Sequence, residues 1–234
     1  MRIFGFQAPV FGASCYLVAA DDGTCVVVDP GGGVAQDVAL VAVEHGLRIA
    51  GVVATHGHAD HVWDAGRVAA AAGVPLRLHE RDAYRLADPL GTTDGSGRGV
   101  ADSLVAALRA NGLDPDDFDA GVVEPFGAGG GPRTPDVELT FGSVTLTARH
   151  APGHTEGSTL YLLAMADERV AFTGDVLFAG TIGRTDLPGG DATAMTATLR
   201  EVVAALPPGT HVMPGHGPAS RMDAELATNP YLAG

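Results

Sequence analysis

Three histidines and an aspartate fall within six consecutive positions of the stretch VVATHGHADHVWDAG, at residues 52–66. They are His56, His58, Asp60 and His61, and an apolar run comes directly before them. Imidazole and carboxylate are donors that zinc and similar divalent metals take in proteins. His56 and His58 lie two residues apart, so an extended loop can point both the same way. Asp60 and His61 follow where a helix should begin, so we expect this loop to give two ligands to each of two metals.

Two ligands do not complete a metal site, so further donors must come from later in the chain. Three segments supply them at the ends of expected strands: HAPGHTEGS with His154, VAFTGDVLF with Asp175 and HVMPGHGP with His216. Glycine or proline flanks each donor, which is typical of tight, fixed loops. A carboxylate has two oxygens to share, so Asp175 can bridge the metals. Five histidines and two aspartates in this pattern favour a two-metal site over a set of capping or core residues.

Hydrophobic periodicity predicts a repeated order of strands and helices. In the first part we expect strands at 2–6, 15–20, 24–30 and 49–55, with helices at 34–46 and 62–72. In the later part we expect strands at 137–141, 144–150, 158–164, 169–175 and 211–217, with a helix at 191–205 capped by Asp191. In each part strands come first, and a helix and a further strand follow, which predicts two facing sheets with outer helices in a single domain over residues 1–234. The glycine-rich residues 88–135 predict a connecting or lid segment with one short helix at 100–112.

Composition narrows the classes of partner. With 46% hydrophobic and 18% charged residues the chain is typical of a soluble globular protein, and no apolar run approaches the length of a membrane helix. The N-terminal stretch does not resemble a signal peptide, so we expect a cytoplasmic protein. A net charge of −14 argues against binding to nucleic acid.

Cys15 and Cys25 are most simply buried thiols, with a disulfide as the less favoured alternative. A homodimer is the default expectation for any oligomer.

The motifs THGHADH, APGHTEGS, TGDVLF and PGHGP together resemble those of the metallo-β-lactamase superfamily, in the same order and over nearly the whole chain. The resemblance implies an α+β fold, the αββα sandwich, with the metals at one edge. It implies a first metal held by His56, His58 and His154, a second held by Asp60, His61 and His216, and Asp175 shared between them. The cofactors would then be two divalent ions, with zinc expected first and iron or manganese as alternatives.

Within that superfamily the run TGDVLFAGTIGRTDLPGGD is most similar to glyoxalase II (hydroxyacylglutathione hydrolase) and its short bacterial relatives. This likeness implies that Arg184 contacts a substrate anion. Asp186 stands where glyoxalase II has a tyrosine, and we expect no C-terminal helical domain after His216. The identity of the thiol carrier is therefore open.

The expected activity is hydrolysis of a small thioester. Two metals that share a water lower its pKa toward 7 and give a bridging hydroxide, which Asp60 would orient as the catalytic residue. A thiolate, whose conjugate acid has a pKa of roughly 8.5, can leave without a dedicated acid. This suits a thioester, or less favourably a lactone, better than an amide. Asp29 either orients a metal-bound histidine or is a turn residue before Pro30.

Two other functions remain open. Persulfide dioxygenases of the same superfamily share HADH, APGHT and GRTD but use one iron, held by two histidines and an aspartate. Here those residues would be His58 or His56, with His154 and Asp175, in a triad with open positions for oxygen. A non-catalytic metal-binding module is less favoured, because a structural site needs four donors and this chain offers seven.

Overall fold

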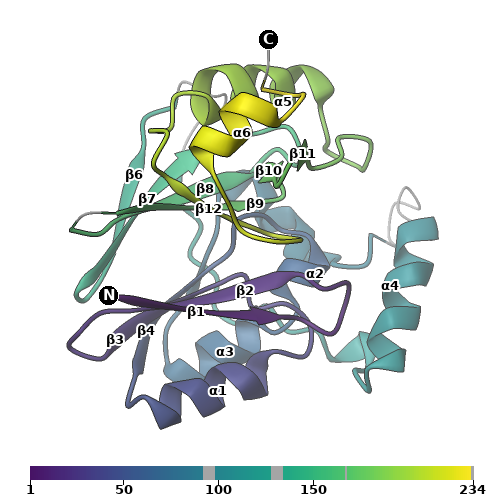
Figure 1. The fold of residues 1–234 in the computed structure, drawn as a ribbon. Helices are drawn as coiled ribbons and strands as arrows, with labels where there is room; N and C mark the ends of the chain where they lie inside the picture. Colours follow the sequence, from purple (N-terminus) through teal and green to yellow (C-terminus); the bar gives the residue numbers. More distant parts are fainter. Residues whose placement is uncertain (92–97, 128–133, 167, 233–234) are drawn as a thin grey trace.

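The computed structural model describes residues 1–91, 98–127, 134–166 and 168–232. Two β-sheets lie face to face at the centre, and helices cover their outer faces (Figure 1). The α+β sandwich of two facing sheets with outer helices, predicted from the sequence, is confirmed. None of the helices within the described residues is long and apolar enough to cross a lipid bilayer.

The first sheet has five strands in the order β1-β2-β3-β4-β5. Their bounds are β1 Arg2–Gln7, β2 Ser14–Ala19, β3 Thr24–Val28, β4 Arg48–Val53 and β5 Leu76–Arg77. The first three strands are antiparallel neighbours, whereas β4 and β5 add in parallel after helical crossovers. The sequence did not predict β5, because two residues are too few to show an alternating pattern.

The helix predicted at 62–72 is two helices, α2 (Ala59–Val62) and α3 (Ala65–Ala72). Asp64 lies between them with φ −95° and ψ 1°. Its Oδ2 accepts hydrogen bonds from the backbone N–H groups of Gly33 and Ala35, at 2.9 and 3.0 Å. Asp64 thereby supplies acceptors at the start of α1 (Ala35–Glu44) from a different part of the chain.

The second sheet has six strands in the order β13-β12-β9-β8-β7-β6. Their bounds are β6 Val137–Phe141, β7 Val144–His150, β8 Thr159–Ala164, β9 Arg169–Gly174, β12 His211–Pro214 and β13 Ser220–Arg221. A small hairpin, β10 (Leu177–Phe178) and β11 (Thr181–Ile182), lies between β9 and α5. The helices are α5 (Ala192–Thr198), which continues as a π-helical turn over Leu199–Val203, and α6 (Met222–Thr228). The predicted cap is confirmed, because Asp191 accepts from the backbone N–H of Thr193 and Ala194.

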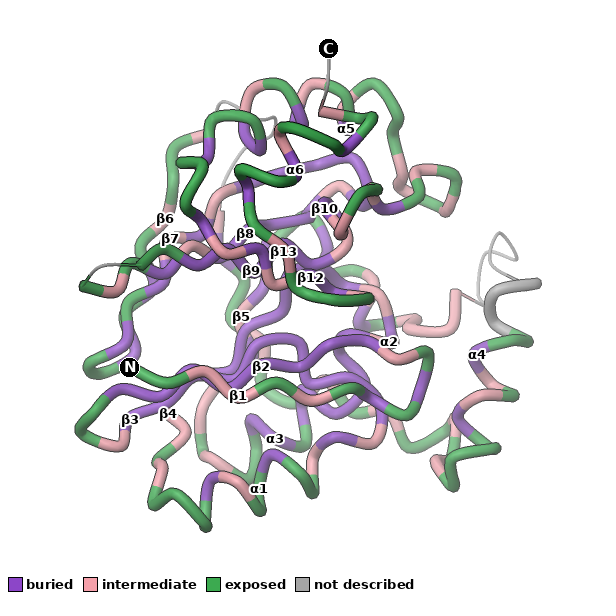
Figure 2. Tube along the Cα trace, in the orientation of Figure 1, coloured by how far each residue is buried: buried purple, intermediate pink, exposed green. Residues whose placement is uncertain are grey.

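The apolar core has three layers. Val26 and Val53 of the first sheet meet Phe141, Tyr161 and Phe172 of the second between the sheets. A second layer lies between the first sheet and helices α1 and α3, and a third lies between the second sheet and helices α5 and α6. Figure 2 shows buried residues along central strands such as β2 and β3, and exposed residues on the outer turns of the helices.

Cys15 and Cys25 are both free and buried, as the preferred interpretation predicted. In the ladder between β2 and β3, Cys25 lies opposite Ala19, four residues beyond Cys15 along β2. The alternative of a disulfide between the two strands is therefore wrong.

The described part of residues 88–135 contains one α-helix and a stretch that contacts β5. Helix α4 (Arg98–Ala110) packs through Leu104 and Leu108 against Trp63 and Val10. Farther on, Val123 and Phe126 form isolated bridges to residues in and after β5. The predicted glycine-rich loops fall partly on residues 92–97 and 128–133, which lie outside the described residues. A 3₁₀ helix at Glu80–Ala87, which the sequence did not predict, precedes this segment.

Candidate metal centre

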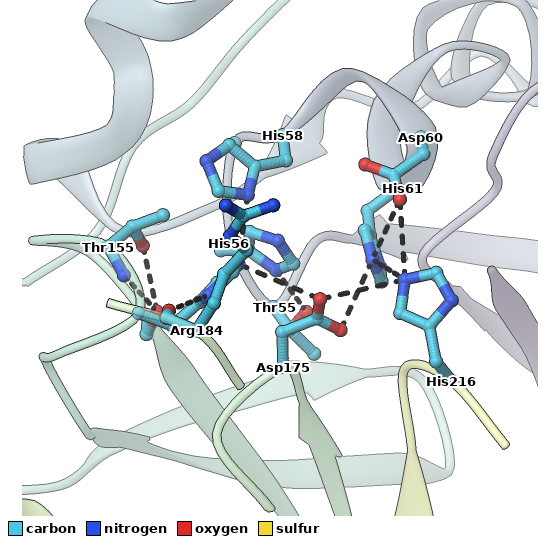
Figure 3. A network of polar contacts seen from close by, with 12 residues as sticks. Thr55, His56, His58, Asp60, His61, Thr155, Asp175, Arg184 and His216 are labelled. Atoms are coloured by element: carbon cyan, nitrogen blue, oxygen red, sulfur yellow. Dashed lines mark hydrogen bonds and ion pairs between the residues drawn. The ribbon is translucent and has the colours of Figure 1, made fainter. Parts of the chain in front are cut away.

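The seven donors predicted from the sequence meet at one edge of the sandwich, each from a segment that follows a strand (Figure 3). The loop after β4 and the start of α2 carry the four residues of the HGHADH stretch. His154 comes from the loop after β7, Asp175 follows β9 and His216 follows β12. The donors thus come from both sheets, so the centre forms only when the two halves of the sandwich meet.

His56, His58 and His154 form a first cluster, with one donor nitrogen from each residue within 4.8 Å of the others. The Nδ1 of His58 and the Nε2 of His154 are 2.9 Å apart. The Nε2 of His56 is buried and has no hydrogen-bond partner within the described residues. Buried polar atoms normally have a partner, so an orphaned imidazole nitrogen in this position fits a metal ligand.

Asp60, His61 and His216 form a second cluster of the same kind. The Oδ2 of Asp60 is 3.3 Å from the Nε2 of His216 and 3.7 Å from the Nε2 of His61. The Nε2 atoms of the two histidines are 3.3 Å apart. These three donors are therefore arranged as a second set, on the other side of Asp175 from the first cluster (Figure 3).

Asp175 lies between the two clusters. Its Oδ2 is 3.6 Å from the Nε2 of His154 in the first cluster and 3.5 Å from the Nε2 of His216 in the second. Its Oδ1 is 3.3 Å from the Nε2 of His61. This carboxylate faces both sets, so it has the geometry of a bridging ligand.

Burial and neighbouring charge set opposite protonation preferences in the two clusters. Burial is the largest influence on the first: it lowers the pKa of His56 and of His154, and that of His58 to about 3. Burial also opposes protonation of His61 and His216, but nearby carboxylates outweigh it and raise the pKa of both. The first cluster therefore offers neutral imidazoles to a metal. In the second cluster, a bound cation can take the place of the histidine protons that neutralise the negative charge of Asp60 and Asp175.

Asp29 and Thr55 orient two of the histidines from behind. The Oδ2 of Asp29 lies 3.1 Å from the Nδ1 of His61 and accepts from the Thr55 hydroxyl at 2.6 Å. The Thr55 hydroxyl is in turn 3.1 Å from the Nδ1 of His56. Asp29 adopts a φ of 52°, unusual for a residue other than glycine. Of the two interpretations left open by the sequence, the structure favours orientation of a histidine.

Asp82 is a site residue that the sequence analysis missed. It is fully buried, and its two oxygens accept from the backbone N–H groups of Gly57 and Gly157, each at 2.8 Å, and from the Thr155 hydroxyl at 2.7 Å. Gly57 separates His56 from His58, and Thr155 follows His154, so one carboxylate ties together the two loops of the first cluster. Within HERDAYRLADP nothing distinguishes Asp82 from an ordinary surface charge.

His150 is the last residue of β7 and supports the loop that follows it. Its Nε2 is 2.8 Å from the carbonyl oxygen of Glu156, and its ring stacks on that of His79 at 4.1 Å. It thus braces the loop that carries His154.

Arg184 lies at the edge of a cleft of about 1060 Å³ that opens onto the candidate ligands. Its guanidinium donates to both oxygens of Asp186, at 2.6 and 2.8 Å. Its carbonyl oxygen is 2.8 Å from the Nδ1 of His154. The backbone of Arg184 therefore orients a candidate ligand, while its side chain faces the solvent and is paired with a carboxylate.

Comparisons with known proteins find similar chains over the full length. An uncharacterized protein of Mycobacterium leprae is 37% identical over 235 residues, covering 100% of both chains. The hydroxyacylglutathione hydrolase GloC of Haemophilus influenzae is 28% identical over 233 residues, covering 99% of this chain and 98% of its own. A protein solved in a di-iron-bound form has a TM-score of 0.72 and 30% identity, covering 98% of this chain and 100% of the other.

The candidate ligands fall inside, or at the last residue of, the segment that matches a family model. The model for the metallo-beta-lactamase superfamily matches residues 8–216. The crystal structure of the B3 metallo-β-lactamase BLEG-1 superimposes with a TM-score of 0.78 at 28% identity, covering 100% of both chains. With a matched fold, a matched family model and clustered donors at one edge of the sandwich, this chain belongs to the metallo-β-lactamase superfamily.

Proposed function

We propose that the chain is a dinuclear-metal hydrolase that cleaves a small thioester. The observation that carries this proposal is the position of Asp175 between two complete three-residue clusters. Membership of a metallo-hydrolase superfamily supports metal-dependent hydrolysis in general. The likeness to a relative named hydroxyacylglutathione hydrolase supports the choice of a thioester.

In this proposal His56, His58 and His154 would hold one ion, Asp60, His61 and His216 the other, and Asp175 both. Zinc is the first expectation, with iron or manganese as alternatives, and a relative solved with two irons shows that a similar fold accepts that metal. Bound in this way, two divalent ions lower the pKa of a shared water toward neutrality and polarise the carbonyl group of the substrate.

The side chains would then position the reactants. Asp60 is the proposed catalytic residue. Its Oδ2 faces His61 and His216, so its Oδ1 would be left to orient the water that the two ions share. In the reaction the water oxygen bonds to the acyl carbon, the carbon–sulfur bond breaks and the thiolate leaves, taking a proton from solution. Asp29, Thr55 and the Arg184 carbonyl oxygen hold three histidines in orientation. Such supporting contacts are worth ~10–100-fold in metal affinity or activity.

The test combines metal content with one pair of variants. The protein should be purified without added metal, loaded with excess metal and desalted. Elemental analysis should then give about two ions per chain. Thiol release should be measured on a panel of acyl-thiols that includes lactoyl-glutathione. His216→Gln should lower the content to about one ion and lower kcat by about 100-fold or more. His211→Gln, which changes a half-exposed histidine at the start of β12, serves as the matched control and should change neither.

The alternative of a mononuclear iron persulfide dioxygenase predicts a different result from the same variants. That enzyme would need two histidines of the first cluster with Asp175, and not His216. One iron per chain after loading, with oxygen uptake on a persulfide that His216→Gln leaves intact, would replace the hydrolase proposal.

A further inference from the structure

Apolar side chains from five separate segments converge on the cleft above the candidate metal centre. They are Phe11 of the β1–β2 loop, Leu90 after the 3₁₀ helix, Leu104 of α4, Phe178 of β10 and Leu187 after β11. Phe178 brings this apolar surface next to the site, since its ring lies edge-on to that of His216 with centroids 6.0 Å apart. With about 1060 Å³ the cleft is larger than a small hydroxyacyl group needs.

Phe11 is the most unusual of these residues. It is 47% exposed, although it is large and apolar, and its φ of 56° places it in the left-handed region. A bulky residue rarely adopts this conformation, and strain of this kind tends to occur at ligand-binding sites. The turn is held by hydrogen bonds from Ala8 N–H to the carbonyl oxygen of Ala13 and from Gly12 N–H to that of Ala8. The turn therefore presents an aromatic ring at the mouth of the cleft.

Arg85 and Arg184, the two arginines among the described residues that line the cleft, are each paired with carboxylates of this chain. Arg85 donates to Glu156 and to the carbonyl oxygen of Pro188, and lies 3.5 Å from the buried Asp82. Arg184 forms a two-point pair with Asp186. All basic residues of the chain are arginines, so no lysine can serve as an anion contact instead. The wall thus offers hydrocarbon surface and cations that are already paired.

We propose that this cleft selects a thioester that carries a bulky, uncharged hydrocarbon group, such as a medium-chain acyl group, over one built on an anionic carrier. The inference rests on the proposed thioester hydrolysis and adds the substrate class. Its physical basis is the transfer of hydrocarbon from water to the apolar wall, worth roughly 0.8 kcal/mol for each buried methylene. An anionic carrier must instead displace Asp186 from Arg184 before it gains a cation.

The experiment compares three substrates on the zinc-loaded protein: acetyl and hexanoyl thioesters of N-acetylcysteamine, and lactoyl-glutathione. The first two share a neutral carrier and differ only in hydrocarbon length. We expect kcat/KM at least tenfold higher for the hexanoyl than for the acetyl thioester, and lowest for lactoyl-glutathione. Phe11→Ser should reduce the hexanoyl preference several-fold. Val43→Ser is the matched control, since it removes an 83% exposed apolar side chain on α1, and should leave the preference unchanged.

Asp186→Asn tests whether the pairing of Arg184 with Asp186 disfavours anionic substrates. Loss of the carboxylate should free Arg184 and raise kcat/KM for lactoyl-glutathione several-fold, with the hexanoyl thioester unaffected. An unchanged kcat/KM for lactoyl-glutathione in this variant would contradict the proposal that the Arg184–Asp186 pair disfavours anionic substrates.

Binding separates failure of the inference from failure of the hydrolase proposal. Uncleavable ketone analogues of the acetyl and hexanoyl thioesters, with a methylene in place of sulfur, should be titrated calorimetrically into metal-free and zinc-loaded protein. At least tenfold tighter binding of the longer analogue, weakened by Phe11→Ser, supports the apolar cleft even if no thioester is cleaved. Equal binding of the two analogues, or faster cleavage of lactoyl-glutathione than of the hexanoyl thioester, would overturn the inference while leaving hydrolysis itself intact.

Discussion

At the scale of single residues, the candidate centre depends as much on supporting carboxylates as on the donors. Asp29, Asp64 and Asp82 are each buried, and each accepts hydrogen bonds from backbone N–H groups of distant segments. A buried carboxylate that satisfies several donors is costly to replace, because its removal leaves those donors without partners. The loops that carry the histidines are held by these contacts.

Asp82→Asn should weaken metal binding at the first cluster by about 10–100-fold, because an amide cannot accept from Gly57, Gly157 and Thr155 on both of its terminal atoms. A titration with a chromophoric chelator should show one weakened and one unchanged binding step. Asp37→Asn, at an exposed position in α1, is the control. Unchanged affinity at both steps, with only a loss of stability, would limit Asp82 to a structural role.

His79 should make the fold sensitive to acid. Burial, followed by the neighbouring His150, lowers the pKa of His79 to about 4 from 6.5. As the pH falls, the unfolded chain therefore binds this proton before the folded chain does. The contribution of His79 to the free energy of unfolding is thus complete above pH 6.5 and is lost between pH 6.5 and about 4. The loss is roughly 3 kcal/mol.

His79→Asn should flatten that part of the pH profile, since asparagine can still accept from the Arg81 backbone N–H but does not titrate. Urea unfolding of both proteins at pH 7, 5.5 and 4.5, with chelator present, measures the difference. If the free energy of unfolding falls with pH by the same amount in both proteins, the acid sensitivity comes from other groups.

At the scale of elements, the sequence predicts what depends on regular patterns and misses what depends on long-range contacts. The strands that precede the donors carry regularly spaced apolar residues, and the donors themselves stand in recognisable spacings. The break between α2 and α3 could not be predicted, because it coincides with a hydrogen bond that Asp64 accepts from the backbone N–H of Gly33, 31 residues earlier. Asp82 was missed for the same reason, since its partners are 25, 73 and 75 residues away.

Asp64→Ala should loosen α1 and its junction with α2 and α3. Two backbone N–H groups at the start of α1 would lose their acceptor, at a cost of about 2 kcal/mol in the free energy of unfolding. Hydrogen exchange should speed up most in α1, and chemical denaturation should give the total loss. Asp117→Ala, in the exposed turn at Pro115–Asp117, is a control that should change stability by less than about 0.5 kcal/mol.

At the scale of the whole molecule, the donors join the two sheets. Bound ions favour only the folded chain, in which residues 56–61 meet His154, Asp175 and His216. Metal at 100 times its dissociation constant adds about 2.7 kcal/mol per site, and each kcal/mol raises Tm by about 2–4 °C in a chain of this size. Treatment with chelator should lower Tm by roughly 5–10 °C per ion lost, and calorimetry at several metal concentrations measures it. A Tm independent of metal would contradict a ligand set that spans both sheets.

The order of the donors along the chain also determines when an ion can be captured during synthesis. Translation begins at the N-terminus, so the HGHADH loop leaves the ribosome far ahead of His216. An ion that meets the nascent loop finds four donors but neither the bridging carboxylate nor the histidines of the second sheet. In the proposed dinuclear site such an ion would stay exchangeable until β12 has docked, because Asp175 and the third donor of each cluster, His154 or His216, come from the second sheet. The metal of the mature protein would then be selected at the last step of folding, by whichever cation the compartment keeps available.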